Sequence, residues 1–146
     1  MQADEIGGVV VEQTGAAKLQ VHVSVRGLEF FADEPAELGG LGSGPSPYDL
    51  LAAGLGACTA MTTRLYADRK GWPLERVRVV VTHEKLTGQT PADIFHRQIA
   101  FEGRLDAEQT ARLFDIAGKC PVHRTLELGA RIETTALSDP PAHPVI

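Results

Sequence analysis

The chain has 146 residues, of which 43% are hydrophobic and 23% are charged, a composition typical of a single globular domain. This length excludes a second domain large enough to carry its own active site. The formal net charge of −5 leaves no basic surplus for binding nucleic acid or an anionic membrane surface. The two cysteines, Cys58 and Cys120, are too few for the disulfide framework of a small secreted domain.

Three segments of the sequence bear on where the protein is located in the cell and on how the chain is divided. Residues Met1–Glu5 are acidic and lack the basic and apolar segments of a secretory signal, so we expect a cytoplasmic protein. The longest apolar run, residues 50–63, is shorter than the roughly 18 residues that a membrane-spanning helix needs, and Arg64 closes it. We therefore expect a core helix there. Residues 138–146 are rich in proline and are predicted to form a tail behind a single domain, residues 1–137.

The first third of the chain has the pattern of β-strands. Residues Gln20–Arg26 alternate between apolar and polar, which is typical of a strand with one face on a core. Further strands are expected at Ile6–Val11 and Leu28–Phe31, in an N-terminal antiparallel sheet. The Gly/Pro/Ser-rich stretch Pro35–Pro47 predicts an irregular loop. Its glycines lack the spacing of a dinucleotide fingerprint and the Gly-Lys-Ser/Thr ending of a phosphate loop, so phosphate binding is not expected.

A long helix is predicted after this loop. Ser46 has the residue type of an N-cap, Pro47 that of a first helical position, and Asp49 lies where a capping-box acid belongs. The helix is expected to run from Leu50 to about Arg69, where a Gly-Trp-Pro sequence ends it.

The second half of the chain predicts more strands and then helices. Residues Val77–Val81 alternate, and Ile94–Phe101 is the expected hairpin partner. Helices are predicted from Asp106 to about Gly118 and over Pro121–Leu128, with a last strand at Ala130–Thr135. Strands, one long helix, further strands and then helices are the order of an α+β fold.

The long helix carries Cys58 in a row of small or soft side chains. Gly54, Ala57, Cys58 and Met61 fall on one face at helical spacing. Because glycine inside a helix costs roughly 0.5–1 kcal/mol relative to alanine, we infer that another element or another subunit approaches closely. The alternative is that Cys58 is an inert, buried small residue, as free cysteine often is.

The surroundings of Cys120 differ. It precedes Pro121, which favours an extended backbone and the N-cap position of the following helix. The positive end of the helix dipole and the neighbouring Lys119 both favour a thiolate there. His123 completes a C-x-x-H spacing, but no second pair completes a zinc site, so neither a metal nor another cofactor is expected. His123 is expected to cap the helix, to face solvent, or to tune Cys120 from nearby.

Two segments together resemble a known family. Ser46–Cys58, SPYDLLAAGLGAC, and Lys119–Glu127, KCPVHRTLE, resemble the two cysteine motifs of the OsmC/Ohr family of osmotically inducible and organic hydroperoxide resistance proteins. The resemblance covers nearly the whole chain, and Tyr66–Val77 looks closest to the OsmC-like branch. It implies an intertwined homodimer in which two sheets wrap around paired central helices.

The resemblance also implies a reaction. Cys58 matches the peroxidatic cysteine of the family and Cys120 the resolving cysteine. The family chemistry is reduction of organic hydroperoxides, and possible reduction of hydrogen peroxide, in oxidative stress defence. A Cys58 sulfenic acid condenses with Cys120 to a disulfide, which an external dithiol reduces.

The sequence departs from the family pattern at the activating groups. Family members have a glutamate ten residues before the first cysteine, where this chain has Tyr48 followed by Asp49. They also have an arginine in the N-terminal sheet, where the candidates here are Lys18 and Arg26. These four residues and His123 are therefore candidate activating or pocket residues.

Two other functions remain open from the sequence. One is a non-peroxidatic OsmC-like dimer that senses redox state or binds a small acyl or thiol compound, which the replacement of the glutamate by Tyr48 favours. The other is a hydrolase in which Cys58 or Cys120 works with His123, although the sequence identifies no orienting acid for the histidine.

Overall fold

The computed structural model describes residues 7–137, which fold into two compact units. The first unit contains the described residues up to Pro47 and those from Arg131 onward, and the second contains Tyr48–Ala130. Residues 1–6 and the predicted tail 138–146 lie outside the described residues. A single domain over residues 1–137 stays a prediction.

The first unit contains a three-stranded antiparallel sheet, as predicted. Strands β1 (Val10–Gln13), β2 (Val21–Val25) and β3 (Leu28–Ala32) lie in the order β1-β2-β3. Arg26, at φ 49°, and Gly27, at φ 75°, form the turn between β2 and β3. The first strand begins at Val10, later than the predicted start at Ile6, and Ile6 lies outside the described residues.

A buried carboxylate organises the glycine-rich loop after β3. Asp33 is 3% exposed and accepts hydrogen bonds from the Ser43 hydroxyl at 2.6 Å and from the backbone N–H groups of Glu34, Leu41 and Ser43. The Ser43 hydroxyl and these N–H groups lower the pKa of Asp33 because they stabilise its ionised form. Gly44 is required where the loop passes β3, since a Cβ there would overlap the carbonyl of Phe31. The loop is thus ordered around Asp33, with a short 3₁₀ helix η1 (Ala36–Leu38).

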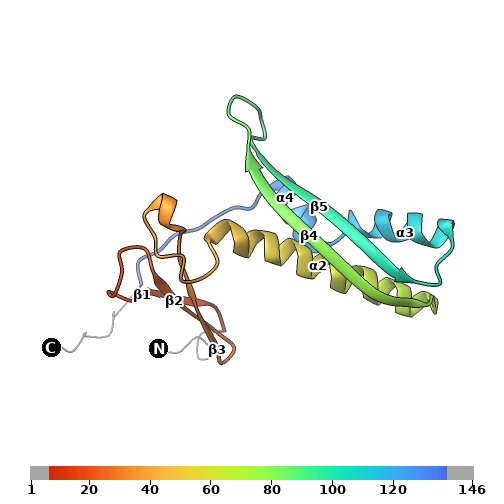
Figure 1. The fold of residues 1–146 in the computed structure, drawn as a ribbon, viewed down its shortest axis with the longest axis horizontal. Helices are drawn as coiled ribbons and strands as arrows, with labels where there is room; N and C mark the ends of the chain where they lie inside the picture. The colour runs from red at the N-terminus through yellow and green to blue at the C-terminus, as the bar shows by residue number, and fades with distance from the viewer. Residues whose placement is uncertain (1–6, 138–146) are drawn as a thin grey trace. The chain divides into compact units, whose positions relative to one another are not determined.

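The second unit consists of a long helix, a hairpin and two shorter helices. Helix α2 (Pro47–Lys70) runs along the antiparallel hairpin of β4 (Leu74–Lys85) and β5 (Asp93–Gly103) (Figure 1). Helices α3 (Ala107–Ala117) and α4 (Pro121–Leu128) follow. The α+β prediction and the predicted order of these elements are confirmed.

Two interfaces hold the second unit together. Ala67, Leu74 and Leu113 form a buried cluster between α2, β4 and α3, and partly buried side chains surround it: Tyr66, Trp72, Val77, Phe101 and Leu105. At Gly56 the helix packs closely on the hairpin, because a Cβ there would lie 3.6 Å from a Val81 methyl carbon. A Cβ at Gly54 would meet nothing within 4 Å, so the row of small side chains on α2 is open at that point.

The strand predicted at Ala130–Thr135 is wrong. Residues 130–137 form no strand, and their side chains are exposed. Gly129 ends α4 at φ 79°, and the segment after it pairs with none of the described strands. Alternation of apolar and polar residues predicts a strand only where a neighbouring strand can accept its backbone hydrogen bonds. None of the helices between residues 7 and 137 is long and apolar enough to cross a membrane.

Candidate active site

Cys58 lies near the middle of α2. Its thiol is free and half-buried, and its Sγ is 3.8 Å from the hydroxyl oxygen of Thr62, one turn further along the helix. The residue is therefore not sealed in the core of the chain.

Cys120 is the N-cap of α4, as the sequence predicted. Its backbone is extended, with φ −66° and ψ 143°, and its Sγ accepts a hydrogen bond from the His123 N–H at 3.3 Å. The residue is free and 0% exposed. A reagent in solution therefore meets Cys58 before it meets Cys120.

Thr59 connects the two cysteine-bearing elements. It directly follows Cys58, is fully buried, and places its Oγ1 4.0 Å from the Sγ of Cys120. Its hydroxyl donates to the carbonyl of Leu55 at 2.7 Å. The turn of α2 that carries Cys58 therefore lies beside the start of α4.

A cation reaches this turn from the hairpin. Arg97 on β5 donates from Nη1 to Thr59 Oγ1 at 3.0 Å and to the carbonyl of Ala117 at 3.2 Å, and from Nη2 to His123 Nδ1 at 3.0 Å. Sequence reasoning missed Arg97. The sequence did contain a signal. Arg97 lies on the same inward face of its strand as Phe95 and Ile99, and a charge on such a face needs polar partners.

The ring of His123 is held at both nitrogens. Its Nε2 lies 3.0 Å from a carboxylate oxygen of Glu127, one turn further along α4. Arginine can only donate, so Nδ1 accepts from Arg97 and the ring proton is on Nε2, bonded to Glu127. His123 meets Cys120 through its backbone N–H, while its ring points to Arg97 and Glu127. Glu127 supplies the orienting acid that the sequence did not identify. The arrangement still does not suit a Cys–His hydrolase, because neither ring nitrogen of His123 is free to take a proton from a cysteine sulfur.

The other candidate residues lie elsewhere. Tyr48 is ten residues before Cys58 on α2, about 15 Å along the helix axis, and its ring stacks on His83 at a centroid distance of 4.3 Å. Asp49 lies in the first turn of the same helix. Lys18 and Arg26 belong to the first unit, so a role for either at Cys58 stays a prediction.

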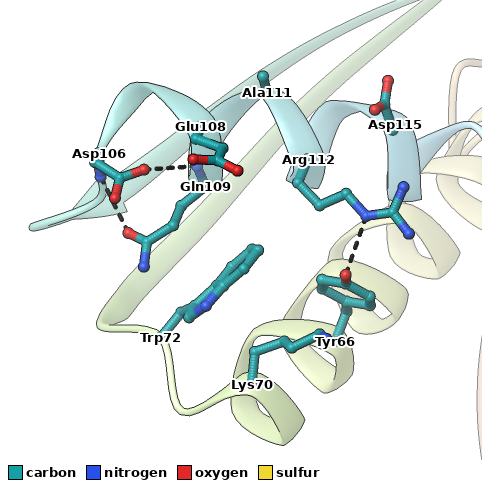
Figure 2. Close-up of a pocket in the computed structure, with 9 residues that line it drawn as sticks. All are labelled: Tyr66, Lys70, Trp72, Asp106, Glu108, Gln109, Ala111, Arg112 and Asp115. Carbon is teal, nitrogen blue, oxygen red and sulfur yellow. Dashed lines mark hydrogen bonds between the residues drawn. The ribbon is translucent and has the colours of Figure 1, made fainter.

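A separate pocket of about 590 Å³ lies where the end of α2 meets α3, and it contains neither cysteine. Arg112 donates from Nε to the Tyr66 hydroxyl at 3.0 Å. Figure 2 shows this hydrogen bond, with Trp72 and Lys70 nearby. The hydrogen bond from Arg112, together with the positive charges of Arg112, Lys70 and Lys119, lowers the pKa of Tyr66. Three acids, Asp106, Glu108 and Asp115, also line the pocket, so it has no single charge character.

No group of three or more His, Cys, Asp or Glu side chains within residues 7–137 is placed to hold a metal ion. The side-chain groups linked to one another at the start of α4 are the Cys120 thiol, the Thr59 hydroxyl, the Arg97 guanidinium and the His123 imidazole.

A family model described as OsmC-like protein matches residues 40–135, a span that contains both cysteines, Arg97 and His123. The chain belongs to the OsmC-like protein family. This confirms the resemblance read from the two cysteine motifs. A search of curated proteins found no match to this OsmC-like chain.

Solved structures share the fold. A Psychrobacter arcticus 273-4 protein, provisionally described as an osmotic stress induced and detoxification response protein, is 23% identical with a TM-score of 0.67, over 80% of this chain and 85% of that one. An OsmC-like protein from Mycoplasma pneumoniae is 20% identical with a TM-score of 0.64, over 82% and 85%. An organic hydroperoxide resistance protein OsmC from Legionella pneumophila is 23% identical with a TM-score of 0.60, over 81% and 88%. These matches confirm the predicted OsmC-like fold.

Proposed function

We propose that this OsmC-like protein is a thiol-dependent peroxidase that reduces organic hydroperoxides in oxidative stress defence. The observation that carries the proposal is the pairing of a reachable thiol with a sealed one: Cys58 is half-buried, and Cys120 is fully buried beside the residue that follows Cys58. The name of the Legionella relative, an organic hydroperoxide resistance protein, supports the same substrate class.

The proposed first step takes place at Cys58. Its thiolate sulfur attacks one oxygen of the hydroperoxide, the O–O bond breaks, and the released alkoxide takes up a proton and leaves as an alcohol. Cys58 is oxidised to a sulfenic acid while the hydroperoxide is reduced. The greater exposure of Cys58 supports this order, because an external oxidant meets the more exposed of the two residues first.

The second step joins the two cysteines. The sulfur of Cys120 bonds to the sulfur of the Cys58 sulfenic acid, the S–O bond breaks, and the hydroxyl group leaves as water with the Cys120 thiol proton. An external dithiol then reduces the Cys58–Cys120 disulfide through a mixed disulfide and is itself oxidised.

We further propose that the working form is a homodimer. Met61 and Leu65 on α2 are 64% and 62% exposed, and the open space at Gly54 lies on the same helix. Exposed apolar side chains and an open glycine on one helix are typical of a surface that a second subunit covers. Cys58 lies between Gly54 and Met61 on this helix, so the proposal places it at the edge of that contact, where a small hydroperoxide can still enter.

The proposal is tested by mixing the reduced protein with cumene hydroperoxide and then counting thiols and measuring intact mass. We expect the wild type to lose both thiols to one disulfide and Cys120→Ser to retain a Cys58 sulfenic acid that a dimedone probe traps. We expect Cys58→Ser to keep Cys120 reduced. Two thiols still titratable in the wild type after exposure to cumene hydroperoxide and hydrogen peroxide would reject a peroxidase.

A second candidate is a redox-sensing or ligand-binding dimer without peroxidase turnover. It is favoured by Tyr48, which replaces the family glutamate and stacks on His83, itself bonded to Asp93 at 2.9 Å. A sensor would form the disulfide, which reduces a single equivalent of hydroperoxide, but would not go on to catalytic turnover with a dithiol present. A binding protein would retain a small molecule in native mass spectrometry.

A further inference from the structure

The hydroxyl of Thr59 has a fixed role as an acceptor toward Cys120. A threonine hydroxyl has one proton and two lone pairs. The proton of Thr59 is donated to the carbonyl of Leu55, and one lone pair accepts from Arg97. The Sγ of Cys120, at 4.0 Å, therefore makes a hydrogen bond with Thr59 only when its S–H is the donor.

Cys120 has the complementary arrangement. Its sulfur accepts from the His123 N–H at 3.3 Å, and the Thr59 hydroxyl oxygen, at 4.0 Å, is the acceptor available to a thiol proton. One donor and one acceptor thus fix the rotation of the S–H bond and the direction of the sulfur lone pairs.

Arg97 is the group that holds Thr59 in this state. It binds acceptors on three other segments of the chain, namely Thr59 on α2, the Ala117 carbonyl at the end of α3, and His123 on α4. Without the Arg97 N–H, both Thr59 lone pairs lack a strong donor, and the hydroxyl loses its fixed orientation toward Cys120.

The Glu127–His123 pair holds Arg97 in turn. Because Glu127 accepts from Nε2, the Nδ1 lone pair of His123 is available to Arg97. The carboxylate therefore selects the tautomer that can bind a guanidinium, as the partners of ligating histidines do in metal sites.

We propose that Arg97 is a positioning residue for the disulfide-forming step, in which it fixes Thr59 so that Cys120 is held as an aligned thiol until Cys58 is oxidised. The inference rests on the proposed function for its biological setting. In the step, the Cys120–Cys58 S–S bond forms, the S–O bond of the sulfenic acid breaks, and the thiol proton leaves with the hydroxyl group as water. Arg97 is unchanged throughout, and Thr59 is the acceptor that faces the departing proton.

The test uses dithiobis(nitrobenzoic acid), which drives the same S–S bond formation without a peroxide. The reagent converts the reachable Cys58 to a mixed disulfide, and Cys120 then displaces a second thionitrobenzoate, so stopped-flow absorbance shows two phases. We expect Arg97→Met and Thr59→Val to slow the second phase about ten- to a hundredfold, as loss of alignment does in intramolecular reactions. The first phase stays at the wild-type rate, and Thr59→Ser restores the second.

The matched control is Arg78→Met. Arg78 is an exposed arginine of the same hairpin, on β4, and both phases should stay at the wild-type rate. Circular dichroism tests whether each variant is folded. If Arg97→Met does not fold, the comparison of Thr59→Val with Thr59→Ser tests the proposal. Wild-type second phases in both Arg97→Met and Thr59→Val would overturn the proposal.

The role of Glu127 has a spectroscopic test of its own. Long-range ¹H–¹⁵N correlation spectra should show His123 with its proton on Nε2 in the wild type and in Glu127→Gln, whose amide oxygen can still accept. Glu127→Ala leaves Arg97 as the remaining group that favours this tautomer, so the preference should weaken and the second phase should slow. The peroxidase proposal and the positioning role can be distinguished. If hydroperoxides do not oxidise the wild type but Arg97→Met and Thr59→Val still slow the second phase, the positioning role of Arg97 stands and the peroxidase function is rejected.

Discussion

Arg112 on α3 donates from Nε to the hydroxyl of Tyr66 on α2 at 3.0 Å, which ties the two helices together beside the buried Leu113. The guanidinium lies 5.5 Å from the centre of the same ring, so it acts on Tyr66 both as a hydrogen-bond donor and as a charge.

The first prediction concerns the titration of Tyr66. Arg112→Gln should raise the pKa of Tyr66 toward its ordinary value, because the main group that lowers it is removed. A side chain whose native pKa is depressed stabilises the fold above its unfolded pKa, and that contribution is lost as the pH falls through the native pKa. The wild type should therefore resist alkaline unfolding better than Arg112→Gln.

Ultraviolet difference absorbance across the alkaline range measures this titration. The chain has two tyrosines, and Tyr66→Phe identifies which part of the signal belongs to Tyr66. An unchanged Tyr66 titration in Arg112→Gln would contradict the assigned cause.

The second prediction concerns acid stability. The pKa of Asp33 is lowered by the Ser43 hydroxyl and by the loop N–H groups, so its contribution to folding is complete above its unfolded pKa and is lost as the pH falls through the native pKa. Asp33→Asn should weaken the loop at neutral pH and flatten the loss of stability in strong acid. Urea unfolding at a series of pH values provides the measurement, and equal pH slopes for the two proteins would disprove it.

The third prediction concerns the core. Leu113 is 0% exposed and packs with Ala67 and Leu74, so Leu113→Ala should lower the free energy of unfolding by about 2–5 kcal/mol. Leu128→Ala is the matched control, because Leu128 is 83% exposed and its truncation should change that free energy by no more than about 0.5 kcal/mol. Urea denaturation distinguishes the two, and similar losses would place the core elsewhere.

The fourth prediction concerns the homodimer. Met61→Lys and Leu65→Asp place charges on the exposed apolar side chains of α2 and should shift the protein to monomer. Leu128→Lys, on α4, should leave the assembly unchanged. Sedimentation velocity measures the oligomeric state, and variants as dimeric as the wild type would exclude this surface as the contact.

Local signals in the sequence predicted the elements of the second unit well. The capping box of Asp106 and Gln109 at the start of α3, and Cys120 before Pro121 at the start of α4, are each written within four consecutive residues. Such signals depend on neighbours along the chain, so they can be read without a fold.

The contacts of the candidate site could not be read in this way. Arg97 and Thr59 are 38 positions apart, and their hydrogen bond depends on how β5 packs against α2. The order of the loop around Asp33 has a related cause, because the carboxylate gathers N–H groups up to ten residues away. The strand predicted at Ala130–Thr135 failed for the reverse reason: the local sequence pattern favours a strand, but none of the described strands pairs with this segment.

The cap of α4 has one more consequence. The sulfur that receives the His123 N–H is the sulfur that a disulfide would consume, so oxidation must alter the acceptor of that hydrogen bond. The chemical shift and exchange rate of a single backbone amide, that of His123, should therefore report the redox state of Cys120 in the intact protein, with no reagent added to either thiol.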